Sequence, residues 1–481
     1  MNVIDGFLLH AKHQPTVAAI CAPGWNYDIV SYGRLLVFAN NAAAHALAAG
    51  LKRGNVVGIF ARDPIFHWAL VIGLTRVGII SFSLHDTNVP TGFAIDAVLA
   101  EAPIPSKTAA RFIRVDQSWV EGDGNAPAAD IENVKDAVAR IILTSGTTGD
   151  QKAVALTHDL IWRRVQTYDF AFGNRFPACS RIFVDVGIAA NSGYLWPIYI
   201  LSRGGTVFVR GSDPAETLQA LSLYGVQGMV APPSGMAEFL DYYEQSPAFL
   251  CPFNVMLSVG SKLATSLSDR VRARMCSYVV HGYGATEGNP VAGAYVHQTA
   301  HIKGAVGYIT PGMIVQAVDD NGKICAPGTE GHIRFRGDKC VTGYVGNPPG
   351  SEKFFRDGWF YPGDIGAVTA DGLLIITGRS KNIIVLGGDK INPEVIESVL
   401  LSCPGVVQAV AIGHANALGI EQVWAAVETR AEVDPESIRA HCARRLAPEL
   451  VPAKVTRVAA MPRNVGGKID RDEVRKLLGS D

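Results

Sequence analysis

Charge is scarce and nearly balanced in this chain of 481 residues. Charged residues make up only 18% of the sequence, and the formal net charge is −1. Proteins that bind nucleic acid or lie on an anionic membrane surface carry a basic excess. We therefore expect neither kind of partner. Hydrophobic residues reach 48%, which is typical of a large globular protein with many buried strands and helices.

The chain also lacks a disulfide framework and the spacing of a metal-binding motif. Its eight cysteines are scattered, with no CxxC pair, which predicts buried thiols in a reducing compartment. No N-terminal segment combines a charged start with an apolar core, so no signal peptide is predicted. The most apolar window, 69–84, contains Gly73, Arg76 and Gly78 and is too short to span a bilayer. We expect a cytoplasmic protein without stable membrane insertion.

Neither low-complexity runs nor internal repeats occur, and the length exceeds what one core can organise. Strand and helix patterns alternate up to Arg379, and a compact unit with its own alternation follows. Its first helix is predicted after Asn392 and Pro393, a helix cap and a first-turn proline. The expected fold class is α/β. A large N-terminal α/β body of stacked sheets flanked by helices (residues 1–379) precedes a small, mobile C-terminal α+β domain (residues 380–481).

One stretch, Ile141–His158 (IILTSGTTGDQKAVALTH), organises the prediction of function. An apolar strand passes into the small residues Thr144–Gly149, and Lys152 follows. Glycines and short hydroxyl residues let backbone and side-chain donors approach phosphate oxygens, and a lysine supplies the opposing charge. After the loop, Thr157 is predicted to cap a helix. This strand–loop–helix order would place phosphates at the end of a sheet.

The loop is not a Walker A motif, because that motif requires glycine before the lysine and a hydroxyl residue after it. Gln151 and Ala153 occupy these positions. A P-loop NTPase is therefore disfavoured. The simpler interpretation, a surface loop rich in serine, threonine and glycine, is opposed by the buried strand before it and the lysine after it.

Three further motifs follow in order. The segment 279–290 (VVHGYGATEGNP) combines an aromatic surface, a hydroxyl and the carboxylate of Glu287. Next, 358–364 (GWFYPGD) ends at Asp364, and 378–381 (GRSK) contains Arg379. A carboxylate can accept hydrogen bonds from both hydroxyls of a ribose diol. Finally, 462–471 (PRNVGGKIDR) places Lys468 on a glycine-rich loop that can move into a site formed elsewhere.

Together these motifs resemble those of the adenylate-forming superfamily of acyl-CoA synthetases, luciferases and adenylation domains. The family forms TSGTTGxPKG, YGxTE and PRxxxGK match here, apart from Gln151 and Ala153 in the first, and the resemblance covers residues 25–475. It implies an AMP-forming acid–thiol ligase that uses ATP, Mg²⁺ and coenzyme A, with a small-molecule carboxylic acid as substrate. An acyl carrier protein is the alternative acceptor, and the oligomeric state is not predicted.

The resemblance also implies residue roles. Lys468, Thr148 and Glu287 would be catalytic, and Glu287 would hold Mg²⁺. The nucleotide would bind Thr144, Ser145, Gly146, Thr147, Thr148, Gly149, Lys152, Gly260, Ser261, Lys262, Gly282, Tyr283, Gly284, Thr286, Asp364, Arg379 and Lys468. The acid would bind near Ala190, Asn191, Tyr194, His281 and Gly288. Coenzyme A would pass Gly387, Gly388 and Asp389, and Lys381 would be the hinge of the small domain.

The acid itself is not predicted. Asn191 aligns with the aspartate of amino-acid-activating domains, and Ala190 with the His or aromatic residue of many acyl-CoA ligases. Both familiar residues are missing, and either position can be a simple helix start. The Lys262 side chain is interpreted as a solvated surface lysine rather than as an acid-binding group.

Three related activities compete with that of an acyl-CoA synthetase. Asn191 argues against an amino-acid adenylation enzyme, because such enzymes have an aspartate at this position. A fatty acyl-AMP ligase is opposed by the lack of an insertion near the domain boundary. A silent homologue is opposed by the presence of both Lys468 and Glu287. No carrier domain follows Lys468, which favours coenzyme A over a fused carrier as acceptor.

Overall fold

The computed structural model describes residues 2–104, 109–125, 134–144, 152–172, 174–245, 253–386, 389–415, 421–430, 432–464 and 468–479. The chain divides into two compact units, which are described separately. Unit 1 comprises residues 1–302, 306–314 and 335–360, and unit 2 comprises 303–305, 315–334 and 361–481. Between residues 303 and 360 the chain alternates between the two units. The sequence instead predicted a single boundary, after residue 379. That single boundary stays a prediction.

One sheet of unit 1 has the strand order β6-β5-β3-β4-β7-β8. Its strands are β3 (Val56–Phe60), β4 (Ile80–Ser83), β5 (Ala97–Ala100), β6 (Arg111–Arg114), β7 (Val138–Thr144) and β8 (Lys152–Thr157). Neighbouring strands are parallel except for β7 and β8. Strands β3, β4, β5 and β7 are largely buried on both faces, which explains their apolar runs, whereas β6 at the edge is mostly exposed.

Part of a second, 15-stranded sheet has the order β15-β14-β13-β12-β11-β9-β10-β1-β2. Its strands are β1 (Ala18–Cys21), β2 (Ile29–Ser31), β9 (Arg181–Val184), β10 (Thr206–Val209), β11 (Gly228–Ala231), β12 (Val255–Ser258), β13 (Val279–Ala285), β14 (Asn289–Tyr295) and β15 (Ala305–Ile309). Strands β12 and β13 are parallel, and β13 and β14 form an antiparallel hairpin. The carboxyl ends of β12 and β13 therefore lie at the same sheet edge.

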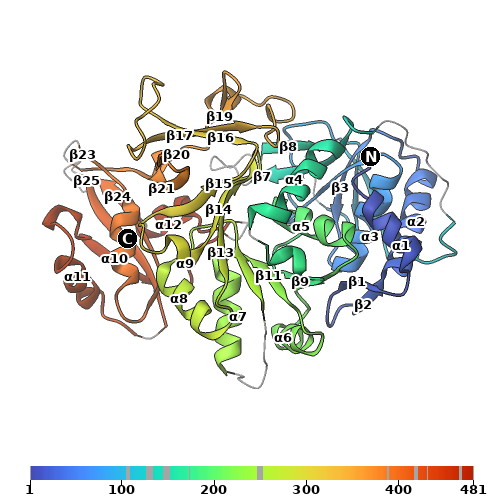
Figure 1. The fold of residues 1–481 in the computed structure, drawn as a ribbon, viewed down its shortest axis with the longest axis horizontal. Coiled ribbons are helices and arrows are strands. Elements are labelled where there is room, and N and C mark those ends of the chain that lie inside the picture. Colours follow the sequence, from blue (N-terminus) through green and yellow to red (C-terminus); the bar gives the residue numbers. More distant parts are fainter. Residues whose placement is uncertain are drawn as a thin grey trace. The chain divides into compact units, whose positions relative to one another are not determined.

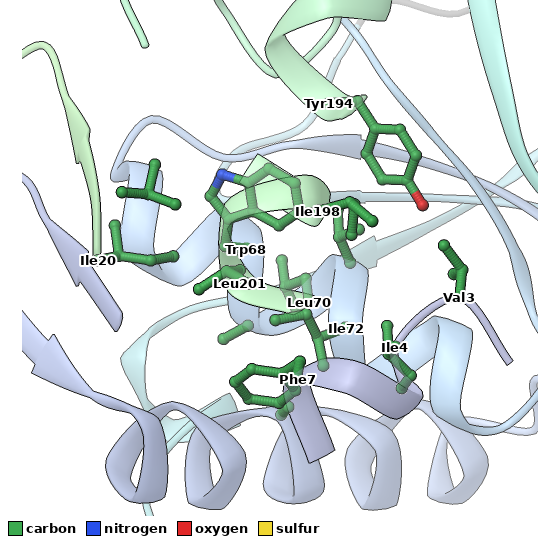
Figure 2. Packing of buried hydrophobic residues seen from close by; sticks show 14 of the residues in the cluster. Val3, Ile4, Phe7, Ile20, Trp68, Leu70, Ile72, Tyr194, Ile198 and Leu201 are labelled. Atoms are coloured by element: carbon green, nitrogen blue, oxygen red, sulfur yellow. The ribbon is translucent and has the colours of Figure 1, made fainter. Parts of the chain in front are cut away.

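Helices cover these sheets and enclose the main core of unit 1. They are α1 (Asp5–His13), α2 (Tyr32–Ala48), α3 (Pro64–Arg76), α4 (His158–Ala171), α5 (Asn191–Ser202), α6 (Pro214–Leu223), α7 (Pro233–Gln245), α8 (Thr265–Arg274) and α9 (Val296–Thr299). Figure 2 shows Trp68 of α3, Tyr194 of α5 and Phe7 of α1 in this core. The rings of Trp68 and Tyr194 stack with centroids 5.8 Å apart. This packing fixes the start of α5.

Unit 2 contains a small sheet in the order β24-β25-β26, with the strands β24 (Val406–Ala415), β25 (Glu421–Thr429) and β26 (Lys454–Val458). Helices α10 (Pro393–Leu401), α11 (Pro435–Ala443) and α12 (Arg471–Gly479) accompany it (Figure 1). The hairpins β20 (Asp364–Val368)–β21 (Leu373–Arg379) and β22 (Ile384–Leu386)–β23 (Asp389–Ile391) precede α10. Asn392 caps α10 and Pro393 begins it, as predicted.

The expected α/β class is confirmed, with a large multi-sheet body and a smaller C-terminal unit. One local expectation needs correction. The loop after β7 was expected to lead directly into a helix, but β8 lies between them and pairs antiparallel with β7. Thr157 does cap the following helix, because its side chain accepts a hydrogen bond from Leu160 N. In the described residues, no helix has both the length and the apolarity needed to cross a membrane.

Candidate active site

The two ends of the phosphate-loop segment lie side by side in unit 1. Thr144 ends β7 and is paired in register with Lys152, the first residue of β8. The Thr144 hydroxyl donates a 3.2 Å hydrogen bond to the Lys152 carbonyl. The loop is thus closed at its base by a hairpin. Ser145, Gly146, Thr147, Thr148 and Gly149, which were predicted to bind phosphate, lie outside the described residues.

The Lys152 ammonium group packs on two aromatic rings. Its Nζ lies 3.3 Å from the centroid of Phe354 and 5.1 Å from that of Tyr344. An ammonium group on an aromatic face is held by cation–π attraction. Burial lowers the pKa of Lys152, and the Glu287 charge opposes this effect. The lysine is therefore positioned by neutral surfaces, which leave its positive charge available to an anionic ligand.

Glu287 lies in the hairpin turn between β13 and β14 and is buried, with 7% of its surface exposed. The Tyr344 hydroxyl donates a 2.7 Å hydrogen bond to Glu287 Oε1. Burial and the Glu287 charge raise the pKa of Tyr344, so this hydroxyl stays protonated and can donate. Tyr344 therefore contacts both Lys152 and Glu287.

The predicted adenine-binding segments meet at one sheet edge. The loop Gly260–Lys262 follows β12, and Gly282–Gly284 belongs to β13, which is its parallel neighbour. Gly260 has a φ of +86°, a left-handed conformation that favours glycine. Gly282 lies against the Phe172 ring, where a Cβ would approach to 3.2 Å. The structure thus brings these two segments together, and their contact with adenine stays a prediction.

The predicted acid-binding residues gather around the start of α5. Ala190 is the N-cap position and Asn191 the first helical residue. The Asn191 side-chain amide donates a 2.9 Å hydrogen bond to Asn289 Oδ1. Tyr194 is fully buried beneath the Arg140 guanidinium group, which lies 4.9 Å from its ring centroid.

Two other predicted acid-binding residues lie along β13 and its turn. Burial, together with the nearby charge of Lys262, lowers the pKa of His281 to about 4, so this side chain is neutral at pH 7. Gly288 packs against Phe335, where a Cβ would come within 2.4 Å of the ring. A glycine is therefore required at 288 for packing, whatever its role toward the acid.

In unit 2, the two predicted ribose-binding residues are direct partners. Asp364 and Arg379 are opposite each other in the β20–β21 hairpin, and Arg379 Nε lies 2.8 Å from Asp364 Oδ1. The Asp364 side chain is nearly buried, whereas that of Arg379 is half exposed. Lys381 follows in a short 3-10 turn, Ser380–Asn382. Burial and the neighbouring Arg379 lower the pKa of Lys381.

Lys468 is exposed in unit 2, at the end of a closed loop. Lys468 N donates to Asn464 Oδ1 at 3.1 Å, and Asn464 N donates to the Lys468 carbonyl at 2.8 Å. These bonds fix the base of the loop that carries the lysine. For the predicted coenzyme A residues, Gly387 and Gly388 lie outside the described part, and Asp389 begins β23.

Sequence reasoning did not identify Tyr344, Phe354 or Arg164. Tyr344 and Glu287 are 57 positions apart, and no local pattern connects them. Arg164 is fully buried on α4, although an arginine on an amphipathic helix normally predicts a solvent-facing position. The only available sequence signal was its position on the helix that follows the phosphate loop.

The acidic residues present suit a nucleotide-bound Mg²⁺ better than a metal held by protein alone. Within the described residues, no group of three or more His, Cys, Asp or Glu side chains could hold a metal ion. Magnesium that accompanies ATP needs only one or two protein carboxylates, because phosphates and water supply the remaining ligands. Glu287 fits this requirement, since its Oε1 is held by Tyr344 and a second oxygen remains.

Two protein families match this chain, and individual known proteins are similar to it over most of its length. The family described as AMP-binding enzyme matches residues 7–345, and the AMP-binding enzyme C-terminal domain matches 395–468. A feruloyl-CoA synthase from Amycolatopsis sp. is 30% identical over 399 residues, with 80% of this chain and 79% of the relative covered. A long-chain-fatty-acid–CoA ligase from Mycobacterium tuberculosis is 27% identical, with 97% and 96% covered.

A solved structure has a similar fold. The o-succinylbenzoate coenzyme A synthetase from Bacillus subtilis, in complex with ATP and magnesium ion, superposes with a TM-score of 0.82 at 21% identity. The match covers 98% of this chain and 99% of that one. At this identity the similarity establishes the fold alone.

Proposed function

Because the chain belongs to the AMP-binding enzyme family, we propose that it activates a carboxylic acid with ATP and transfers the acyl group to coenzyme A. The family resemblance inferred from the sequence motifs is confirmed by these matches. The observation that carries the proposal is the arrangement of Lys152, Tyr344 and Glu287 beside the phosphate-loop hairpin. It combines a cation for phosphate with a carboxylate suited to Mg²⁺.

In the first half-reaction, a carboxylate oxygen of the acid attacks the α-phosphate of ATP and expels pyrophosphate. An acyl-adenylate forms. Negative charge develops on the phosphate and on the leaving group, and preorganised cations stabilise it. Lys152 would bind the phosphates at the base of the hairpin, and Lys468 would approach the α-phosphate from its closed loop. Mg²⁺ held at Glu287 would neutralise phosphate charge.

The nucleoside would be held at two places. The sheet edge formed by Gly260–Lys262 and Gly282–Gly284 offers backbone surfaces to adenine. The Asp364–Arg379 pair offers a carboxylate to the ribose hydroxyls. Asp364 is already oriented by Arg379, so ribose binding would require little rearrangement of the side chain.

In the second half-reaction, a thiol attacks the acyl carbon and AMP leaves. We propose coenzyme A as the thiol and Lys381 as the hinge between the two half-reactions. A feruloyl-CoA synthase and a long-chain-fatty-acid–CoA ligase, which match 80% and 97% of this chain, support this acceptor. Transfer to a separate carrier protein is the less favoured alternative.

The acid is proposed to lack an α-ammonium group. Asn191 and neutral His281 offer no negative charge to such a group. Asp185, which follows β9, accepts hydrogen bonds from Nε and Nη2 of Arg210 at 2.7 Å and 2.8 Å. Its charge is already compensated, so it would be a poor partner for an ammonium group.

The test is pyrophosphate release with hydroxylamine as trap, measured across aliphatic, aromatic, dicarboxylic and amino acids. The proposal predicts acid-dependent pyrophosphate and the matching hydroxamate with at least one carboxylic acid. Pyrophosphate that appears at the same rate without any acid, or no release with the whole panel, would contradict it.

A further inference from the structure

Arg164 is a buried cation whose hydrogen bonds all go to neutral acceptors. It lies on α4 with no exposed surface. Its Nε and Nη2 donate to the Lys339 carbonyl at 3.0 Å and 2.9 Å. Among the described residues, no carboxylate forms an ion pair with it. Burial lowers the pKa of Arg164 to about 10, so it remains charged at pH 7. Placing an unpaired cation in the interior is costly, which calls for a compensating role.

The same side chain also holds the turn that carries Glu287. Arg164 Nη1 donates to the Thr286 carbonyl at 2.9 Å, and Nη2 donates to the Glu287 carbonyl at 3.1 Å. Val341 N donates to the Glu287 carbonyl at 2.8 Å as well. Two consecutive peptide groups are therefore fixed. This fixes the direction in which the Thr286 hydroxyl and the Glu287 carboxylate leave the backbone.

The contacts match the shape of a guanidinium group and not that of an ammonium group. One planar group with five donors reaches three carbonyls on two separate segments, whereas a lysine presents a single nitrogen. A fourth acceptor, Asn191 Oδ1 at 3.5 Å from Nη1, connects the guanidinium group to the start of α5.

We infer that Arg164 is a positioning residue that holds the Thr286–Glu287 turn in the geometry needed to bind ATP together with Mg²⁺. The inference rests on the proposed function, because it assumes that this ligand binds at Glu287. It differs from a purely structural role in predicting an effect that depends on the metal. Loss of the hydrogen bonds from Arg164 to the turn should weaken the binding of ATP with Mg²⁺ more than the binding of ATP alone.

The test compares Arg164→Lys with wild type by calorimetric titration of ATP, with Mg²⁺ and with EDTA. Affinity for ATP with Mg²⁺ should fall about tenfold or more, the scale of losing a hydrogen bond to a charged group. Affinity for ATP in EDTA should change less than about threefold, which corresponds to a loss of under one neutral hydrogen bond.

Two matched controls separate this role from general effects of replacing arginine. Arg163→Lys changes the neighbouring, half-exposed arginine, which pairs with Asp159 at 2.7 Å, and should leave binding unchanged. Arg140→Lys changes another fully buried arginine, which donates to Ser81 and Ser83 and does not contact the turn. It should lower the unfolding temperature without a selective loss of magnesium-dependent affinity.

A second variant, Arg164→Met, fills the same volume without charge. Replacement of buried charges by apolar groups often preserves folding, so this variant should fold and should still lose affinity for ATP with Mg²⁺. The inference is contradicted if either folded variant binds ATP with Mg²⁺ as wild type does, or loses both affinities equally. Failure of both variants to fold also contradicts it. A wild type that binds no ATP would instead refute the proposed function.

Discussion

The Tyr344 hydroxyl donates a 2.7 Å hydrogen bond to Oε1 of Glu287, across 57 positions of sequence. The ring of the same tyrosine lies 5.1 Å from Lys152 Nζ. One side chain thus links a cation at the base of the phosphate-loop hairpin with the carboxylate proposed to hold Mg²⁺. This relationship generates the first prediction.

Replacing Tyr344 by phenylalanine should keep the aromatic surface under Lys152 and remove only the donor to Glu287. A hydrogen bond to a charged group contributes about 1.5–3 kcal/mol. The rate of adenylate formation should therefore fall roughly tenfold to a hundredfold, measured by pyrophosphate release. Phe354→Leu is the control, because it removes a ring under Lys152 and keeps the Glu287 donor. A rate for Tyr344→Phe within twofold of wild type would show that the hydroxyl does not support catalysis.

Lys468→Ala should separate the two half-reactions. If Lys468 stabilises the charge that develops on the α-phosphate, adenylate formation should fall about a hundredfold or more. Thioester formation from supplied acyl-adenylate should survive much better, because no pyrophosphate leaves in that step. Asn464→Ala, which removes a hydrogen bond at the base of the loop, should have a smaller effect on the first step. Equal losses in both half-reactions would contradict the assignment.

Stability should decrease on acidification because of His67. This buried side chain bonds Ser83 Oγ at 2.7 Å and the Ala61 carbonyl at 3.1 Å. Burial, and then the Arg140 charge, lower the pKa of His67 to about 3. Well above pH 6.5 the ring is neutral in both the folded and the unfolded states. Below that value only the unfolded chain takes up the proton, so stability is lost as pH falls from 6.5 toward 3.

The expected contribution of His67 at pH 5 is a loss of about 2 kcal/mol in the free energy of unfolding. His158 and His281, whose pKa values burial lowers to about 4, act in the same direction. Comparison with His67→Gln isolates the effect. The difference in unfolding free energy between pH 7.5 and pH 5 should be smaller in the variant by about this amount. Identical pH dependence in both proteins would disprove the role of His67.

Free α-amino acids should be poor substrates. A buried ammonium group without a carboxylate partner costs several kcal/mol, and Asp185 is already paired with Arg210. ATP–pyrophosphate exchange should therefore be weak with every common amino acid and stronger with at least one unsubstituted acid. Asn191→Asp should improve exchange with amino acids relative to wild type. Robust ATP–pyrophosphate exchange by the wild-type protein with an amino acid would contradict this prediction.

Much of the architecture could be predicted because the strands and loops that carry the motifs have strong local patterns. The apolar run before Thr144 forms β7, and Thr157 caps α4 as expected. Strand β8 was missed because KAVALT is a short apolar run between a loop and a helix cap, and such runs are ambiguous by periodicity.

The supporting residues could not be predicted from local patterns. Arg164 reaches Thr286 across 122 positions, and its buried position results from the packing of α4 against the β13–β14 hairpin. The Asp364–Arg379 pair is different, because a short hairpin joins two residues that the sequence had already named. Contacts within one hairpin follow from sequence, whereas contacts between distant elements require the fold.

The most direct measurement of the central claim is mass spectrometry of a reaction containing the protein, ATP, Mg²⁺, coenzyme A and the best acid from the hydroxamate panel. The account predicts acyl-CoA and AMP in equal amounts, both abolished when ATP or the acid is omitted. Adenylate that accumulates without acyl-CoA, while an added carrier protein becomes acylated, would contradict the coenzyme A assignment. Acyl-CoA accompanied by ADP and phosphate would contradict the adenylate mechanism itself.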